Sequence, residues 1–230
     1  MLFPKRRALI NWDYYSIQLT ERREDMNNSR KKLTVLDQIA TPDKVRKKIV
    51  DAASILYAKK GFADTSIEEI SETAGVSQSV TRSYVKEKSE IMRMIMEDVL
   101  DIFKGNLVKM IEGIDDPEEK LAVAINIYFR VVNQQREKAI LIYQKSSSLD
   151  KASKSKVMQL EVEVSNIFAT IISEGIEFGV FKRVDVDLMA YNILMMAHMW
   201  ILKRWHFKDR LTHDRYFQFQ LENIMDALKQ

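Results

Sequence analysis

The chain has 230 residues, of which 46% are hydrophobic and 30% are charged, a composition typical of a soluble globular protein with one or two cores. It contains no cysteine, which excludes disulfide bonds, zinc–thiolate sites and thiol nucleophiles and favours a cytoplasmic location. The net charge of +3 is unevenly spread, because residues 1–48 carry 12 Lys and Arg against 6 Asp and Glu. This excess indicates either a polyanionic partner for the N-terminal part or a solvated basic tail.

The sequence predicts an all-α fold, because only 6 Gly and 3 Pro are present and no segment alternates between apolar and polar residues. Residues 1–40 show no sustained periodicity and are expected to form a basic, poorly ordered arm. Residues 41–90 are expected to form a small helical domain and residues 91–230 a larger one. The longest apolar run, over 188–202, is shorter than the roughly 20 residues of a spanning helix, so we expect no membrane span.

Capping signals mark the first helices of the small domain. Thr41 and Pro42 are typical N-cap and first-turn residues and predict a helix over 43–60. The segment from Thr65 to Glu68 fits a capping box, in which Thr65 is the N-cap residue and Glu68 reaches back to its amide. A second helix is therefore expected to begin directly after Thr65.

Two short helices, over 66–73 and 77–84, are joined by Gly75, and Ser77 caps the second of them. Such a pair with a Gly-containing turn predicts a helix-turn-helix motif, whose second helix enters the major groove of DNA. Gly75 permits a positive φ and hence a sharp turn. The residues expected to face inward from the second helix are Val76, Val80, Tyr84 and Val85.

The other side of this second helix is polar and is expected to meet DNA. Gln78 can pair bidentately with adenine, and Arg82 with guanine. Hydroxyl and ammonium groups at the edge of the motif can bind phosphates. The predicted DNA-binding residues are Thr65, Ser77, Gln78, Ser79, Arg82, Tyr84 and Lys88.

The segment "GFADTSIEEISETAGVSQSVTRSYVKEKSEI", residues 61–91, resembles the N-terminal signature of the TetR family of bacterial transcriptional regulators. The matching features are Gly61-Phe62 at the end of the first helix, Ala-Gly-Val-Ser at 74–77, and the exit with Tyr84, Lys86 and Lys88. The resemblance implies a homodimeric, ligand-responsive repressor that binds a palindromic operator. It also implies a helix-turn-helix domain over 41–90 and an effector-binding and dimerisation domain over 91–230.

Three positions depart from the family pattern, which usually has Leu, Tyr and Phe where this chain has Thr81, Arg82 and Val85. Thr81 is expected to weaken the packing of the second helix of the motif. Arg82 is expected to alter base readout, or to contact phosphate alone. An alternative function is a helical protein–protein adaptor whose helix-turn-helix does not bind DNA.

The basic residues near the start of the first helix extend the predicted DNA surface. A flexible basic arm can lie in the minor groove beside a recognition helix. The alternatives are non-specific attraction to phosphate and plain solubility. The residues concerned are Arg30, Lys31, Lys32 and Arg46.

Helical periodicity continues to the end of the larger domain. The expected helices cover 91–111, 118–135 and 138–145, then a long helix to about Phe178 after a loose start at 146–155, then 187–206 and 213–229. The helix over 187–206 is apolar on nearly every side, so we expect a second copy of the chain to cover it. The resemblance implies that the last two helices form this dimer interface. Its predicted residues are Met196, Trp200, Phe217, Leu221 and Ile224.

The resemblance also implies an effector pocket in the larger domain. Met-rich surfaces suit long, flexible apolar ligands. Gly175 and Gly179 are expected to leave room for such a ligand or to end a helix. The predicted pocket residues are Phe103, Leu107, Tyr128, Phe129, Val132, Tyr143, Phe168, Ile172, Met195 and Met199.

The segment "GVFKRVDVD" and the pair Arg204-Trp205 resemble the branch of the family that responds to acyl-coenzyme A thioesters and controls fatty-acid degradation. This resemblance implies an acyl-coenzyme A effector, although a hydrophobic drug or an aromatic acid fits the composition equally well. The cationic residues Lys203, Arg204 and His206 would meet coenzyme phosphates, or form a solvated helix end.

We predict no catalytic or metal site and no cofactor other than the small-molecule effector. The 3 histidines lack the H-E-x-x-H spacing, and the sequence has no Gly-rich phosphate loop and no G-x-S-x-G motif. Carboxylate pairs such as Glu118-Glu119 lie at helix starts, where the helix dipole explains them.

Overall fold

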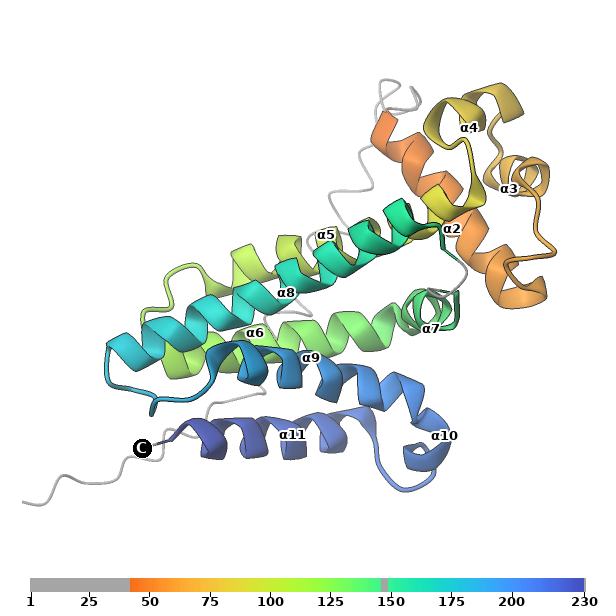
Figure 1. Cartoon of the computed structure of the whole chain (residues 1–230). Helices are drawn as coiled ribbons and strands as arrows, with labels where there is room; N and C mark the ends of the chain where they lie inside the picture. The colour runs from red at the N-terminus through yellow and green to blue at the C-terminus, as the bar shows by residue number, and fades with distance from the viewer. Residues whose placement is uncertain (1–41, 146–148, 230) are drawn as a thin grey trace, which may run out of the picture. The chain divides into compact units, whose positions relative to one another are not determined.

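The computed structural model describes residues 42–145 and 149–229 (Figure 1). These residues form ten helices and no strand, which confirms the predicted all-α fold. The predicted arm contacts Arg30, Lys31 and Lys32 and the predicted cap Thr41 lie outside the described residues. The helices are α2 (Pro42–Lys60), α3 (Ile67–Ala74), α4 (Gln78–Tyr84), α5 (Lys88–Ile111), α6 (Pro117–Gln134), α7 (Arg136–Lys145), α8 (Lys151–Glu177), α9 (Val186–Leu202), α10 (Arg204–Phe207) and α11 (His213–Leu228).

Helices α3 and α4 form the predicted helix-turn-helix, but its capping box lies one residue later than predicted. Ser66 is the N-cap residue, because its Oγ accepts a hydrogen bond from the Glu69 amide at 3.2 Å. The Glu69 Oε2 in turn accepts from the Ser66 amide at 2.9 Å. The prediction of Thr65 and Glu68 is wrong, because two overlapping segments fit the pattern and tertiary packing selects the later one.

The turn between α3 and α4 has the predicted geometry. Gly75 has a φ of +62°, in the left-handed region, and its amide donates to the Glu72 carbonyl at 3.1 Å. Ser77 then caps α4, where its Oγ accepts from the Val80 amide at 3.4 Å. The short connection therefore holds α4 at a fixed angle to α3.

The inward side of α4 differs from the prediction. Val80 is 39% exposed, whereas Thr81 is completely buried and donates its hydroxyl to the Ser77 carbonyl at 3.2 Å. Because the hydroxyl is satisfied within the helix, Thr81 can occupy a core position. Val85 is buried as predicted. The residue that was expected to weaken the packing is thus the one that faces the core.

The long helices of the larger domain pack around α6 and α8 (Figure 1). Helix α8 contacts α5, α6 and α9, and α6 also contacts α9 and α11. An aromatic cluster lies between these helices, with ring centroids 5.1 Å apart for Phe103 and Tyr128 and 6.0 Å apart for Phe103 and Phe168. These rings are buried and fix the spacing of α5, α6 and α8.

The two glycines near the end of α8 differ in their surroundings. Gly175 lies against the Phe181 ring, and a Cβ there would be 2.1 Å from Phe181 Cδ2. Gly179 has a φ of +70° and follows the last residues of α8, so it ends the helix as one of the two predicted alternatives stated.

Two helices of the larger domain differ most from those expected. A loose helix start was expected over 146–155. Helix α8 is regular from Lys151 and is capped by the Asp150 carboxylate. The helix expected over 187–206 is divided at Lys203 into α9 and the single turn α10. Within residues 42–145 and 149–229, no helix combines the length and the apolar character needed to cross a membrane.

Candidate functional site

The exposed side of α4 gathers four of the predicted DNA-binding residues. Ser77, Gln78, Ser79 and Arg82 all lie at the surface. Tyr84 is half-buried at the end of the helix. Short serine side chains beside two long polar ones allow the helix to approach base edges closely.

A carboxylate predicted for the capping box instead binds the two longest of these side chains. Glu68, on α3, accepts hydrogen bonds from Gln78 Nε2 and from Arg82 Nη2, the latter at 2.8 Å. A backbone hydrogen bond at the start of α3 and the Arg82 guanidinium lower the pKa of Glu68. Glu68 is therefore ionised at neutral pH and occupies the groups that would meet a base pair.

Thr65 and Lys88 have structural roles in place of the predicted phosphate contacts. The Thr65 side chain is 1% exposed and its hydroxyl donates to the Gly61 carbonyl at 2.8 Å. The Lys88 ammonium donates to the carbonyls of Phe62, Ala63 and Thr65 at 2.8–2.9 Å. Since an ammonium has three protons, Lys88 is fully used in closing the α2–α3 connection.

Arg46 is likewise used inside the protein rather than at the predicted DNA surface. Its Nη2 lies 2.7 Å from Glu97 Oε2 and 3.3 Å from the Met94 carbonyl, both on α5. Arg93 pairs with the other oxygen of Glu97 at 2.6 Å. Arg46 therefore ties α2 of the helix-turn-helix unit to the first helix of the larger domain.

A second ion-pair cluster joins α2, α5 and α7. The Lys138 ammonium of α7 lies 2.6 Å from Asp98 Oδ2 of α5 and 3.1 Å from Asp51 Oδ1 of α2. Lys138 and Asp98 are buried, and Lys47 Nζ stands 3.8 Å from Asp98. An ammonium this deeply placed needs its carboxylate partners, so the three helices are held in one arrangement.

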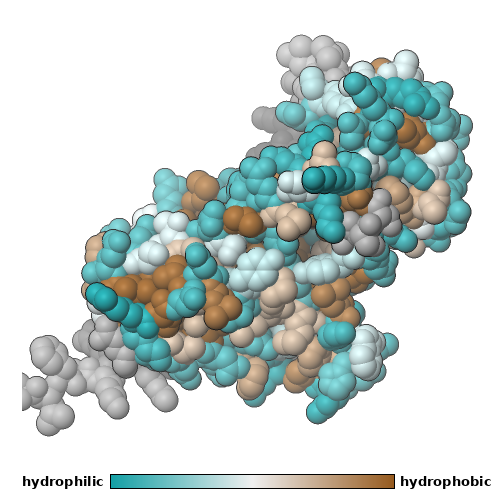
Figure 2. All heavy atoms as spheres, in the orientation of Figure 1, coloured by the Kyte–Doolittle hydropathy of each residue, from teal (hydrophilic) through white to brown (hydrophobic). Residues whose placement is uncertain are grey.

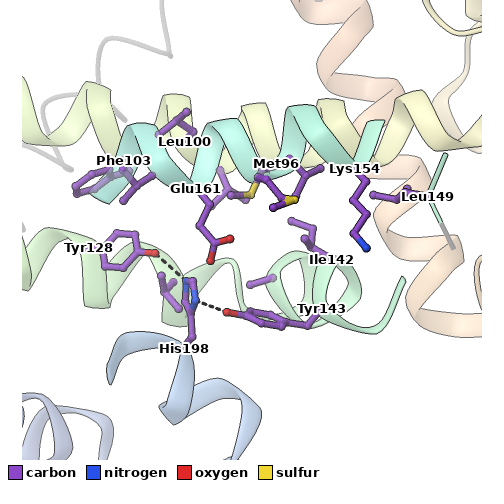
Figure 3. Close-up of a pocket in the computed structure, with 16 residues that line it drawn as sticks. Met96, Leu100, Phe103, Tyr128, Ile142, Tyr143, Leu149, Lys154, Glu161 and His198 are labelled. Atoms are coloured by element: carbon purple, nitrogen blue, oxygen red, sulfur yellow. Dashed lines mark hydrogen bonds between the residues drawn. The ribbon is translucent and has the colours of Figure 1, made fainter. Parts of the chain in front are cut away.

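A largely apolar pocket of about 200 Å³ lies among α5, α6, α7, α8 and α9 (Figure 3). Its apolar walls come mainly from α5, α7 and α8. Five polar residues interrupt them. The lining residues are Met96, Val99, Leu100, Phe103, Tyr128, Val132, Ala139, Ile142, Tyr143, Leu149, Lys154, Val157, Met158, Glu161, Val164 and His198.

Two tyrosines bracket a buried histidine in this pocket. His198 Nε2 is 2.7 Å from the Tyr128 hydroxyl and its Nδ1 is 2.6 Å from the Tyr143 hydroxyl (Figure 3). Burial lowers the pKa of His198 to about 4, so the imidazole is neutral at physiological pH. Burial also raises the pKa values of both tyrosines, which keeps their hydroxyls protonated.

Glu161 and Lys154 of α8 reach the same pocket. The Glu161 carboxylate points toward His198, whereas Lys154 lies at the other end beside Leu149 (Figure 3). Burial raises the pKa of Glu161, and a hydrogen bond with the Tyr191 side chain opposes this shift. The pocket thus has a hydrogen-bonding end and a cationic end.

The pocket contains four of the ten residues predicted for it, namely Phe103, Tyr128, Val132 and Tyr143. Leu107, Phe129, Phe168 and Ile172 are buried in the core instead, because the pocket occupies the half of the domain nearer α7. Met195 and Met199 of α9 do not line it either, and Met199 is 37% exposed. His198 is not among the predicted residues, because nothing in its spacing indicated a pocket.

Four of the five predicted dimer residues pack within their own chain. Trp200, Phe217, Leu221 and Ile224 are buried, and Met196 is half-buried. The Phe217 ring lies 5.5 Å from Phe129, because α6 covers this side of α9 and α11. These four side chains are therefore already covered within one chain. The exposed apolar residues of these two helices are Leu188, Tyr191, Met199, Leu202 and Phe219.

The helix-turn-helix has a polar recognition face, and ion pairs join it to a helical domain with an apolar pocket. This combination is typical of a transcriptional regulator that has its DNA-reading and ligand-binding parts in one chain. The family described as bacterial regulatory proteins, tetR family, matches residues 49–80. A tetracyclin repressor-like C-terminal domain matches residues 114–209. The chain belongs to the TetR family of transcriptional regulators, as its sequence indicated.

Relatives and solved structures agree with this assignment. The chain is 28% identical to the HTH-type transcriptional regulator HbdR of Aromatoleum sp. (strain CIB), over 84% of this chain and 85% of that protein. Its fold matches FadR of Bacillus subtilis in complex with stearoyl-CoA, with a TM-score of 0.68, 21% identity, and coverage of 79% and 98%. It also matches AibR in complex with isovaleryl coenzyme A and operator DNA, with a TM-score of 0.64, 18% identity, and coverage of 80% and 99%.

Proposed function

We propose that this chain is a homodimeric repressor whose affinity for operator DNA is controlled by a short acyl-coenzyme A thioester in the α5–α9 pocket. The observation that carries the proposal is that two helices which line the pocket also hold α2. Helix α5 supplies Met96 and Phe103 to the pocket, and α7 supplies Ile142 and Tyr143. A ligand that changes the spacing of α5 and α7 would therefore act on the helix-turn-helix unit.

The ion pairs give this coupling a physical route. Lys138 of α7 pairs with Asp51 of α2 and Asp98 of α5. Glu97 of α5 pairs with Arg46 of α2. A shift of α7 relative to α5 stretches these pairs or moves α2 with them, because neither partner can be left unpaired cheaply. The effector would thus favour a conformer in which the two recognition helices of a dimer are wrongly spaced.

On the DNA side, binding requires an exchange of partners at Glu68. Gln78 and Arg82 would leave this carboxylate and bind base edges or phosphates. The exchange replaces one set of hydrogen bonds with another, so its net cost is modest. The presence of Glu68 beside α4 would also weaken non-specific binding to phosphate, since like charges repel.

Dimerisation supplies the second recognition helix, and the outer face of α9 is the surface we assign to it. Leu188, Tyr191 and Met199 are exposed there, and Leu188 is 60% exposed. Figure 2 shows hydrophobic side chains gathered where the end of α8 meets the start of α9. A symmetric pair of these faces would bury them without covering α4.

The size of the pocket supports a short acyl group. A dry cavity of about 150 Å³ takes benzene, so the about 200 Å³ found here suits a group of six or so carbons. We therefore propose a short acyl group in place of the long, flexible ligand expected from the methionine content. Two of the neighbours in fold were solved with acyl-coenzyme A thioesters, one short and one long. Lys154 at one end of the pocket suits the polar, anionic remainder of such a molecule.

The test is a mobility shift on duplex DNA from upstream of the gene, titrated with hexanoyl-coenzyme A. We expect a specific complex that the thioester dissociates and that free coenzyme A leaves intact. Val99→Phe fills the pocket from α5 and should make the complex insensitive to the thioester. Val108→Phe, on the same helix but 65% exposed, is the matched control and should respond as the wild type does.

Three outcomes count against the proposal. A specific complex that ignores every acyl-coenzyme A would retain the repressor and remove this effector class. Equal responses of the two phenylalanine variants would place the effector elsewhere. Failure to select any duplex from genomic fragments would favour the protein–protein adaptor.

A further inference from the structure

Four of the five polar residues of the pocket lie at one end of an otherwise apolar space, which a plain alkyl chain does not require. His198, Tyr128, Tyr143 and Glu161 face this end (Figure 3). Lys154 is seven residues from Glu161 on the same helix, which places the two about 10 Å apart along α8. The ligand that fits has an apolar middle and a polar group at its buried end.

Glu161 is the residue that most needs a partner from the ligand. Its side chain is half-buried beside apolar residues, and among the residues described it forms no ion pair. Burial raises the pKa of its carboxyl group, with the Tyr191 hydrogen bond as the one opposing contribution. A carboxylate in an apolar pocket is stabilised by each hydrogen-bond donor that reaches it.

The two hydrogen bonds of His198 with the tyrosines provide a donor that complements the Glu161 carboxylate. A neutral imidazole donates from one nitrogen and accepts at the other. With the hydrogen on Nε2, His198 donates to the Tyr128 hydroxyl and accepts a hydrogen bond from the Tyr143 hydroxyl at Nδ1. The Tyr128 O–H is then left as a donor in the pocket. This end of the pocket thus offers a hydroxyl donor next to a carboxylate acceptor.

We propose that the effector carries a hydroxyl group at its buried end, which donates to Glu161 and accepts from the tyrosine–histidine row. A hydroxyl group satisfies both sides at once. An amine would donate to Glu161 but has no acceptor when protonated, and a methyl end would leave all of these groups desolvated. The effector is therefore a hydroxylated short acyl thioester, with the hydroxyl about 10 Å from the group that meets Lys154.

This inference rests on the proposed function, since it names the ligand of the same pocket. Isothermal calorimetry without DNA distinguishes a failure of this inference from a failure of the proposed function. The matched ligands are hexanoyl-coenzyme A and 6-hydroxyhexanoyl-coenzyme A. We expect the hydroxylated thioester to bind about 10- to 100-fold more tightly, as for one hydrogen bond to a charged group. Glu161→Leu should abolish or reverse this preference, and Glu161→Gln should retain part of it, because the amide oxygen still accepts.

Glu163→Gln is the control, because Glu163 lies two residues away on α8, outside the pocket, and pairs with Lys104 at 3.0 Å. It should preserve the wild-type preference. Equal binding of the two thioesters to the wild type would overturn the hydroxyl inference and leave the acyl-coenzyme A proposal standing. Binding of neither thioester would overturn both. A preference that survives Glu161→Leu would refute the assignment of the hydroxyl to Glu161.

Discussion

Replacing Lys138 with methionine tests whether the buried ion pair holds the two parts of the protein together. Lys138 is 9% exposed, and its ammonium lies 2.6 Å from Asp98 and 3.1 Å from Asp51. Lys138→Met keeps most of the length of the side chain and removes the charge. Asp98 then remains buried, and Lys47, at 3.8 Å, is the one remaining cation paired with it among the residues that the structure describes.

The magnitude follows from which partner is left behind. Breaking a buried ion pair by removing one member costs about 3–5 kcal/mol. The Asp51 side chain is 46% exposed and regains water, so its share is about 0–1 kcal/mol. Lys47 still partly compensates Asp98, which favours the lower limit of about 3 kcal/mol. For a chain of this length, that loss lowers Tm by about 6–12 °C.

The assay is thermal and urea unfolding of Lys138→Met, Asp98→Leu and the double variant. The double variant should be clearly less destabilised than the sum of the single ones, because an apolar pair needs no compensating charge. Lys145→Met, on the same helix, is the matched control and should change Tm little. A single-variant loss below about 1 kcal/mol, or strict additivity, would show that the pair is not a structural tie.

Four further results are expected. The folded-state pKa of His198, about 4, is below the unfolded value of about 6.5, so the unfolded chain binds the proton first and stability falls as pH drops through this window. Urea unfolding at pH 7 and pH 4 should show a loss on the order of 3 kcal/mol, reduced in His198→Gln. Tyr57→Phe removes a buried hydroxyl that has no partner in the described structure and should raise unfolding free energy by about 1 kcal/mol. Gly175→Ala forces a Cβ into the Phe181 ring and should lower stability by about 1–3 kcal/mol in the same assay. In DNA-binding titrations, Arg82→Ala should weaken operator affinity by about 1–3 kcal/mol, and Glu68→Gln should strengthen it.

Each of these expectations has an outcome that contradicts it. An acid profile unchanged in the His198 variant would mean that another group accounts for the loss. A less stable Tyr57 variant would reveal a partner for its hydroxyl, such as bound water. A fully stable Gly175 variant would mean that the ring moves aside easily. Operator binding that is indifferent to Arg82 would remove this residue from the reading face.

The sequence was sufficient for the features that depend on local chemistry. The two short helices, Gly75 between them and the Ser77 cap follow from residue types at fixed spacing, and all are present. The capping box was placed one residue early because Thr65 and Ser66 both satisfy the pattern. Packing decided between them, since Thr65 is in the core.

Features that depend on long-range contacts were not predictable in this way. The sequence predicted Arg46 and Lys88 as free cations beside a DNA-reading helix. Arg46 instead pairs with Glu97, 51 residues away on α5. Lys88 binds carbonyls of the α2–α3 connection, up to 26 residues away. His198 acquires its role only when α6 and α7 bring Tyr128 and Tyr143 to its two nitrogens. Charge and hydropathy specify which residues need partners, but the fold specifies which partners they find.

The dimer residues illustrate the same limit. Helix α9 is apolar on most sides, and the sequence could not say which side its own chain covers. Trp200 faces inward, where its Nε1 donates to Asn133 at 2.9 Å, whereas Leu188 and Tyr191 face outward. A helix with two apolar faces requires the rest of the fold before one of them can be assigned to a partner.

The most direct test of the account is the affinity of the thioester measured by calorimetry with and without saturating operator DNA. If ligand and DNA favour different conformers of one protein, each must weaken the other by the same factor. We predict that bound operator lowers the affinity of 6-hydroxyhexanoyl-coenzyme A at least about 10-fold, matching the loss of operator affinity caused by the thioester. Equal thioester affinities in the two titrations would contradict the claim that the pocket controls DNA binding.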